Sequence, residues 1–426
     1  MTKRLVLVVI DGLTPEVYED AVERGTAPTL AALHAAGSYR RALSTFPSLT
    51  PVCMATLATG AHPDVHGIPH LVWYHRGEGR LVEYGSSFGA MRAAGARRSM
   101  RDAIVEMNAR HLSREAVTVF ESLEDAGLTA AAVNPPCYRG RTRHVPLVPG
   151  LVGPVDGPRR FFFYSLFESD VTGAPLAVRA RAGGSIDAYG AAVGRWLVTR
   201  DGFDFLFLYL PDYDYASHAL GPGGAEEALR RSDGAVGALV EAAGGLDGFL
   251  ERYAVIVCSD HGQTHVERAV TLQTALRDRP GARVTASNRA GMVYTDEPRE
   301  VARLLAGVDG VDVALFREGG DAYAVRDGGE ARIDSAGAGW EGRAARALAN
   351  RNSGEVVVSA ALGVEFADLG GRHHVGGGSH GSLLDGDSLV PMLAVGAGDP
   401  PEEIAGVAPR VLEHFGIDAP AYARAA

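Results

Sequence analysis

Short apolar runs separated by amphipathic stretches constrain the fold of this chain more than any other feature. Runs of this length without polar alternation are typical of strands buried on both faces. They lie at Leu5–Ile10, Leu128–Val133, Phe205–Tyr209, Ala254–Cys258 and Leu389–Val395. Helical patterns lie between most of them, at Pro15–Glu23, Ala116–Ala126, Ile186–Val198, Glu226–Ala243 and Ile404–Phe415. Strands alternating with helices predict an α/β fold, a mainly parallel central sheet with helices on both faces.

Two segments do not follow this alternation. Residues 266–369 combine short apolar runs at 291–294, 311–316 and 322–325 with a helical pattern at 298–306, among many Gly, Arg and Asp residues. We interpret this segment as a smaller α+β insertion that caps a catalytic, metal-binding core formed by residues 1–265 and 370–426. Residues 74–114 are rich in Gly, Arg and Met. They predict an irregular loop with one helix.

Composition narrows the class of protein. The formal net charge of −11 disfavours a duplex nucleic acid partner, since such binders usually carry a basic face. No apolar stretch is long enough to cross a bilayer, and the first apolar run stops at Asp11 after six residues, which argues against a secretion signal. Three widely spaced cysteines, Cys53, Cys137 and Cys258, suggest a reducing compartment. We therefore expect a cytoplasmic protein.

The first candidate site residues are Asp11 and Thr50. Asp11 ends the first apolar run, at the edge where ligands bind in parallel sheets, although it could also cap the helix that follows. Thr50 precedes Pro51, a favoured first helical residue, so Thr50 is predicted at the N-cap and Gly60 near the helix end. A hydroxyl there is either a plain cap or a nucleophile. A threonine nucleophile needs a base or a metal to activate it.

Metal-ligand residue types follow the later strands. Asp214 and His218 are four residues apart and share a helical face, with Asp212 as a competing ligand. Asp260 and His261 directly follow another run, and His380 lies in a glycine-rich loop. His373 and His374 are interpreted as surface histidines. Asp and His side chains gathered at one sheet edge predict a zinc-like site, with manganese or iron as alternatives.

Together these runs resemble the type I phosphodiesterase/nucleotide pyrophosphatase family of the alkaline phosphatase superfamily. The resemblance rests on Val9–Gly12, Phe46–Thr50, Thr59–Gly60, Pro63–Ile68, Asp214–His218, Gly221–Pro222, Ser259–Gly262, Ser379–Gly381 and Pro409–Leu412. It implies an alkaline phosphatase-like fold and two zinc-like ions. Asp214, His218 and His380 would hold one ion, and Asp11, Thr50, Asp260 and His261 the other. Thr50 would be the nucleophile and would carry the phosphoryl group before water releases it, with the helix from Pro51 helping to hold the phosphate oxygens.

One departure from the family pattern concerns the phosphate donor. The family has an Asn three residues after the nucleophile, where this chain has Cys53, and a thiol is a weak donor. We expect the backbone, the metals or another side chain such as Tyr213 or Tyr215 to stabilise the phosphate instead. Cys53, Tyr213 and Tyr215 are candidate substrate contacts. Trp73 and Tyr84 are candidates for the mouth of the site.

Three hypotheses follow. The first is a hydrolase of phosphodiester or pyrophosphate bonds in a small phosphorylated molecule such as a nucleotide. The second is a phosphonate hydrolase or phosphomonoesterase of the same superfamily. The third is a catalytically silent metal-binding protein, against which the hydroxyl at position 50 and the six ligand positions count.

Overall fold

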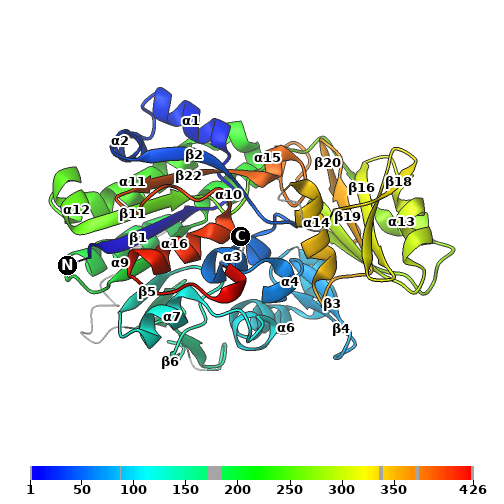
Figure 1. Cartoon of the computed structure of the whole chain (residues 1–426), viewed down its shortest axis with the longest axis horizontal. Coiled ribbons are helices and arrows are strands. Elements are labelled where there is room, and N and C mark those ends of the chain that lie inside the picture. The colour runs from blue at the N-terminus through cyan, green and yellow to red at the C-terminus, as the bar shows by residue number, and fades with distance from the viewer. Residues whose placement is uncertain are drawn as a thin grey trace.

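The computed structural model describes residues 2–86, 88–148, 150–169, 185–334, 339–369 and 374–423. An eight-stranded sheet lies at its centre, in the order β2-β22-β11-β1-β10-β5-β8-β9 (Figure 1). The strands are β1 Arg4–Ile10, β2 Ser38–Leu43, β5 Ala130–Val133, β8 Arg160–Phe163, β9 Phe167–Glu168, β10 Phe205–Leu210, β11 Tyr253–Cys258 and β22 Leu389–Val395.

Five adjacent strands, β11, β1, β10, β5 and β8, are parallel. The expected mainly parallel α/β fold is therefore confirmed. β22 is antiparallel to β11, and β2 and β9 are antiparallel to their neighbours β22 and β8. The chain enters β22 from the short helix α15 (Asp385–Ser388), close to the carboxyl end of β11, so β22 has to run in the opposite direction.

Helices cover both faces of the sheet. Alternate residues of β1 point to opposite faces, and all of its apolar side chains are buried. Val6, Val8 and Ile10 pack in one core with the helices α1 Pro15–Glu23, α2 Pro28–Ala36, α9 Ile186–Val198, α11 Glu226–Ala242 and α12 Leu246–Arg252. Leu5, Leu7 and Val9 pack in the other core with α3 Thr50–Thr59, α7 Val119–Asp125 and α16 Val407–His414.

A second sheet lies beside the central one, at the right of Figure 1. It is antiparallel, in the order β14-β15-β19-β16-β17-β18, and α13 packs on it. Its elements are β14 Arg283–Ser287, β15 Ala290–Tyr294, α13 Pro298–Ala306, β16 Val311–Glu318, β17 Asp321–Arg326, β18 Gly329–Arg332, α14 Trp340–Ala349 and β19 Val356–Ala360. This α+β unit lies inside the predicted insertion. The boundaries 265/266 and 369/370 stay a prediction.

The expectation for residues 74–114 was wrong. A hairpin, β3 Val72–His75 with β4 Arg80–Glu83, is followed by the helical segments α5 Phe88–Ala94, α6 Ala96–Arg101 and the π-helix η1 Asp102–His111. The guanidinium of Arg80 donates to both carboxylate oxygens of the buried Asp102, at 2.6 and 2.9 Å. This contact between hairpin and helix is tertiary, so local sequence patterns do not reveal it.

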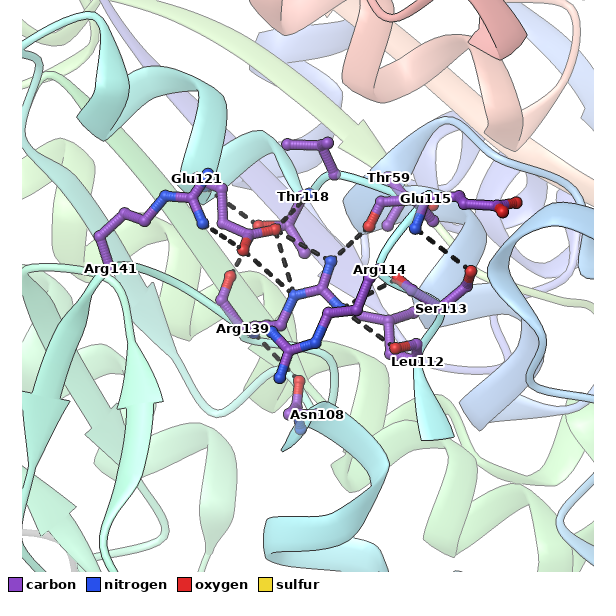
Figure 2. Close-up of polar contacts among 12 residues, drawn as sticks. Thr59, Asn108, Leu112, Ser113, Arg114, Glu115, Thr118, Glu121, Arg139 and Arg141 are labelled. Atoms are coloured by element: carbon purple, nitrogen blue, oxygen red, sulfur yellow. Dashed lines mark hydrogen bonds and ion pairs between the residues drawn. The ribbon is translucent and has the colours of Figure 1, made fainter. Parts of the chain in front are cut away.

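A buried arginine joins this helical segment to the main fold. Arg139 donates to the backbone carbonyls of Leu112 and Ser113, at 3.1 and 3.0 Å, and to the carboxylate of Glu121 (Figure 2). Asn108 accepts from the backbone N–H of Arg139 and donates to the carbonyl of Pro136 at 2.8 Å. The end of η1, the start of α7 and the loop after β5 are thus held as one unit.

The remaining elements are short connections around these two sheets. They are α4 Pro63–His66, β6 Thr142–His144, β7 Val155–Gly157, α10 Asp212–Leu220, η2 Pro222–Gly224, β12 Thr264–His265, β13 Arg268–Val270, η3 Leu272–Leu276, β20 Val364–Phe366, β21 Gly378–Ser379, η4 Ile404–Gly406 and η5 Ala421–Ala423.

Candidate active site

Thr50 is the first residue of α3, and Leu49 is the N-cap. The prediction that Thr50 itself caps the helix was wrong, and its side chain is therefore not used by the helix. The backbone N–H groups of Val52 and Cys53 both donate to the carbonyl of Leu49. Pro51 has no N–H, so the first turn offers mainly the amide of Thr50 to an anion. Gly60 ends the helix in the left-handed region, at φ +67°, as expected.

Three neighbouring parallel strands bring acidic residues to one edge of the sheet. Asp11 follows β1, Asp260 follows β11, and Asp214 lies in the first turn of α10 after β10. Asp11 does not cap α1, because the Thr14 side chain accepts from the N–H of Val17. Asp212 does not join the group either, because its carboxylate accepts from the N–H groups at the start of α9.

His380 reaches the same edge from the loop after β21. Gly381, which follows it, has φ +123°, and a Cβ there would lie 3.0 Å from a Leu49 methyl group and 3.2 Å from the Ala290 nitrogen. Only glycine fits this conformation without strain. The close approach brings the imidazole of His380 against that of His261, with ring centroids 3.6 Å apart.

The candidate ligand atoms lie close together. The Nε2 atom of His261 is 3.3 Å from an oxygen of Asp11 and 3.4 Å from an oxygen of Asp260. His218 Nε2 is 3.3 Å from Asp214, and His380 Nε2 is 3.9 Å from the other oxygen of Asp214. Thr50 Oγ1 lies 3.1 Å from His261 Nε2. The structure thus brings all seven predicted ligand residues together.

Hydrogen bonds orient all three imidazoles in the same way. The Nδ1 atoms of His218, His261 and His380 lie 2.8, 3.0 and 2.8 Å from the backbone carbonyls of Gly378, Gly262 and Ser48. A carbonyl only accepts, so each Nδ1 carries the proton and donates it. The Nε2 lone pairs therefore point to the shared site, as in histidines that bind metals.

The charges at the site are unbalanced without cations. Burial, together with the neighbouring carboxylates of Asp260 and Asp214, raises the pKa of Asp11 well above its ordinary value. Burial also raises the pKa of Asp260. For Asp214, burial opposes ionisation, but the adjacent imidazoles, chiefly His218, outweigh it and lower the pKa. Burial and the neighbouring His261 lower the pKa of His380 well below its ordinary value.

The donor set fits divalent cations. One oxygen each of Asp11 and Asp260 is buried without a hydrogen-bond partner. Two groups of three ligand atoms, Asp11/Asp260/His261 and Asp214/His261/His380, each lie within 4.8 Å of one another. Carboxylate oxygens and imidazole nitrogens are the ligands of zinc and of similar ions. A carboxylate left unpaired in the interior is costly, and a cation would offset that cost.

A cavity of about 420 Å³ opens over this site. Its described lining residues are Asp11, Thr50, Pro51, Leu71, Tyr84, Gly85, Ser86, Pro136, Tyr164, Tyr209, Asp214, Tyr215, His218, Ala219, Asn288, His374, Val375 and His380. Tyr215 and Tyr84 are among them, as expected. Among these described residues there is no Lys or Arg.

Three other candidate substrate contacts lie elsewhere. Cys53 is fully buried in the core, with its Sγ 3.3 Å from the hydroxyl of Ser44. Tyr213 is also buried, and its hydroxyl donates to the carbonyl of Pro222 at 3.1 Å. Trp73 packs beside His111, inside the hairpin segment. None of the three belongs to the described lining, so we do not retain them as substrate contacts.

Several further residues at the site were not predicted from the sequence. The Tyr209 hydroxyl donates to Asp11, and the Gln263 side chain donates to Asp214. Asn288, from the turn between β14 and β15, lies 3.3 Å from His380 Nε2. Gln263 directly follows the Asp260-His261-Gly262 run, so its position in the sequence indicates a residue near the site. Asn288 comes from the insertion, and its position in the sequence gives no such indication.

The interpretation of His374 as a surface histidine was wrong. Its ring stacks on that of His218, with centroids 4.1 Å apart, and its Nδ1 lies 2.8 Å from the buried carboxylate of Glu365. The ring therefore forms part of the cavity wall. His373 lies outside the described residues.

Within the described residues, none of the helices combines the length and apolar character needed to cross a membrane.

Comparisons with known proteins identify the family and the fold. The family model for type I phosphodiesterase / nucleotide pyrophosphatase matches residues 5–383. A phosphonoacetate hydrolase from Sinorhizobium meliloti 1021, in complex with phosphonoformate, is similar in structure, with a TM-score of 0.66 and 19% identity over 97% of this chain and 96% of that one. No curated protein matches the sequence.

A murine ectonucleotide pyrophosphatase / phosphodiesterase 5, in an inactive form in complex with AMP, has a TM-score of 0.65 and 16% identity over 98% of this chain and 96% of that one. The human protein of the same name has a TM-score of 0.66 at the same identity and coverage. At these identities the similar structures show the fold, and the family match covers most of the chain. The chain therefore belongs to the type I phosphodiesterase / nucleotide pyrophosphatase family, a family of hydrolases.

Proposed function

We propose that this protein hydrolyses phosphodiester or pyrophosphate bonds in a small molecule, with Thr50 as the nucleophile and two divalent cations, zinc being the first choice. The observation that carries the proposal is the position of the Thr50 hydroxyl. It lies at the first residue of α3, 3.1 Å from His261 Nε2, and it lines the cavity that also contains Asp11 and Asp214.

Side chains of this protein supply the proposed ligands of both cations. Asp11, Asp260, His261 and the Thr50 hydroxyl would hold one cation, and Asp214, His218 and His380 the other. When bound, the cations would supply Lewis acidity, lower the pKa of the hydroxyl and offset the negative charge of the phosphoryl group. Tyr209 and Gln263 orient the carboxylates of Asp11 and Asp214 through hydrogen bonds.

The reaction proceeds in two displacements. Thr50 Oγ1 loses its proton and forms a bond to phosphorus, while the bond from phosphorus to the leaving oxygen breaks and that oxygen takes up a proton. Thr50 then carries the phosphoryl group together with the second substituent of the substrate. Water attacks phosphorus from the side that the first leaving group occupied and gives up a proton, while the bond from phosphorus to Thr50 Oγ1 breaks and Thr50 regains a proton. The backbone N–H of Thr50, left free by the helix, is available to a phosphoryl oxygen in both steps.

The aromatic residues of the lining support a diester as the substrate. Tyr84, Tyr164 and Tyr215 offer aromatic surface to an uncharged leaving group. A structural neighbour in complex with AMP and another in complex with phosphonoformate make both substrate classes worth testing.

The first test replaces the nucleophile. Thr50→Ala should lower turnover of bis-p-nitrophenyl phosphate by at least about 10³-fold, as expected when a covalent nucleophile is lost. Thr59→Ala, which removes a hydroxyl bonded to the carbonyl of Ala55 within the same helix, should retain activity. Mass spectrometry of acid-quenched wild-type enzyme should find a p-nitrophenyl phosphoryl group on Thr50.

The assay also separates the alternatives. Undiminished turnover by Thr50→Ala would contradict the proposed mechanism. Hydrolysis of phosphonoacetate or p-nitrophenyl phosphate in preference to the diester would identify a phosphonate hydrolase or a phosphomonoesterase. A protein that binds two cations and turns over none of these compounds would be a metal-binding protein without this activity.

We also propose a cytoplasmic location. Cys53, Cys137 and Cys258 are all buried and free, and no disulfide bond links them. This pattern is typical of proteins from reducing compartments. Cell fractionation with an antibody to the native chain tests it, and recovery in an extracellular fraction would contradict it.

A further inference from the structure

We propose that Asn288 is an additional metal ligand, which the insertion contributes to the cation held by Asp214, His218 and His380. This inference rests on the proposed two-metal centre. The side-chain amide nitrogen of Asn288 lies 3.3 Å from His380 Nε2, and Asn288 lines the cavity beside that imidazole.

The separation of these atoms matches that of the other ligand pairs. In a tetrahedral zinc site, metal–ligand distances of about 2.0–2.1 Å put two ligand atoms about 3.4 Å apart. The pairs His218/Asp214, His261/Asp11 and His261/Asp260 have separations of 3.3, 3.3 and 3.4 Å. The contact between Asn288 and His380 has the same length.

The hydrogen bonds around His380 direct its lone pair to Asn288. Because His380 Nδ1 donates to the carbonyl of Ser48, its Nε2 has a lone pair and no proton. An amide N–H facing this lone pair makes a hydrogen bond when no cation is bound. With a cation between them, the amide oxygen is favoured in that place, since oxygen is the ligand atom of an Asn side chain.

The amide can turn without losing its second contact. The hydroxyl of Ser287 lies 2.9 Å from Asn288 Oδ1, and a hydroxyl can either donate or accept. After rotation by half a turn, the amide nitrogen donates to Ser287 and the oxygen faces His380. The asparagine backbone is meanwhile held by the bond from the N–H of Phe366 to the carbonyl of Asn288, at 2.7 Å.

The competing explanation for Asn288 is its backbone conformation. It occupies the two-residue turn of the hairpin in which Ser287 pairs with Ala290, at φ +56°, a region that asparagine tolerates better than most residues. Glycine adopts this conformation without strain. Asn288→Gly therefore removes the side chain and keeps the turn, which separates the two explanations.

The experiment measures metal binding rather than activity. Zn²⁺ would be titrated into the metal-free full-length protein against a fluorescent chelator, and the visible absorption of the Co²⁺ form would report the coordination number. Asn288→Gly should weaken one of the two binding steps by about tenfold or more and change the Co²⁺ spectrum. Asn288→Asp, which keeps an oxygen and adds a charge, should tighten the same step.

Two controls make the outcome decisive. Val375→Asp adds a carboxylate elsewhere in the cavity lining, so an equal gain in affinity there would mean that charge alone explains the Asn288→Asp result and would overturn the assignment. Matching thermal unfolding of the metal-free Asn288→Gly and wild-type proteins would show that the turn is intact. If the metal-free Asn288→Gly protein were less stable than wild type, the test would rest on Asn288→Asp, because aspartate also tolerates this turn. Zn²⁺ affinity of Asn288→Asp no higher than that of wild type would then overturn the assignment.

The failure of this inference differs from the failure of the proposed function. Wild-type protein that binds no Zn²⁺ would refute the two-metal centre itself. Wild-type protein that binds two ions, with unchanged affinity in Asn288→Gly, would refute only the role of Asn288. Unchanged affinity together with slower diester hydrolysis would instead make Asn288 a hydrogen-bond donor to the phosphate.

Discussion

Individual histidines in this chain differ in function because their two ring nitrogens meet different partners. At the candidate metal centre, backbone carbonyls take the Nδ1 proton of His218, His261 and His380 and leave Nε2 free. In His70, both nitrogens are used within the fold. Its Nδ1 accepts from the N–H of Val72, and its Nε2 donates to the carbonyl of Ala290, both at 3.2 Å.

His70 gives a prediction for the dependence of stability on pH. Burial lowers the pKa of His70 from 6.5 to about 4. In the unfolded chain the imidazole of His70 therefore takes up a proton below pH 6.5, whereas in the folded chain it stays neutral down to about pH 4. The contribution of a neutral His70 is present above pH 6.5 and is lost as pH falls through this window.

Urea unfolding of wild type and His70→Gln, whose amide can still donate to Ala290, checks this. Between about pH 7.5 and about pH 5.5, the stability advantage of wild type over the variant should shrink by about 1 kcal/mol. An advantage that stays constant over this range would show that His70 does not have the inferred pKa.

At the scale of elements, the wall of the cavity depends on contacts between segments far apart in sequence. The hydroxyl of Tyr84, at the end of the β3–β4 hairpin, is hydrogen-bonded to Nδ1 of His111 in η1, at 2.8 Å. Pro136, another lining residue, is held through Asn108 of the same helix. Arg139 connects these pieces to α7 (Figure 2).

We therefore predict that Arg139 stabilises this unit strongly. Arg139→Met would remove the buried cation that pairs with Glu121, leaving the half-exposed Arg141, and would remove the donor to the carbonyls of Leu112 and Ser113. Removal of one partner of a buried ion pair costs about 3–5 kcal/mol. Urea denaturation should show a loss of this size in the free energy of unfolding.

Arg141→Met is the matched control. Arg141 also pairs with Glu121, but its side chain is about half exposed, so its removal should cost less than about 1 kcal/mol. Equal losses in the free energy of unfolding for the two variants would show that burial does not make the ion pair of Arg139 with Glu121 stronger than that of Arg141.

At the scale of the whole molecule, the candidate centre draws residues from the edge of the central sheet and from the second sheet. Asp11, Asp214 and Asp260 come from the central sheet, His380 comes from a loop that returns after the insertion, and Asn288 comes from the insertion itself. Three buried carboxylates oppose one another without cations, as the raised pKa of Asp11 indicates. Bound cations should therefore stabilise the whole fold.

Metal removal tests this directly. With free Zn²⁺ at a hundred times its dissociation constant, each site should add about 2.7 kcal/mol to the free energy of unfolding. Chelation should lower the melting temperature in scanning calorimetry, and added Zn²⁺ should restore it. An unchanged melting temperature in protein shown to lose its metal would contradict the proposed role of the cations in stability.

Much of the fold could be predicted because its strongest signals are local. The runs at β1, β10 and β11 are apolar on both faces, which only a sheet covered on both sides can bury. The helices α1 and α9 have the predicted bounds, and the side chains of Thr14 and Ser185 cap their N-termini. The structure of residues 74–114 was not predicted, because contacts between residues far apart in sequence, such as Arg80 and Asp102, stabilise it.

For the site, the sequence by itself determined which residue types follow each buried strand. Parallel strands end at one edge, so Asp11, Asp214 and Asp260 had to converge once the sheet formed. Only the tertiary structure decided the rest. It placed Cys53 and Tyr213 in the core and brought His374 and Asn288 to the cavity. The physical reason is that contacts across a fold depend on how loops and lobes pack in three dimensions, which residue spacing along the chain does not encode.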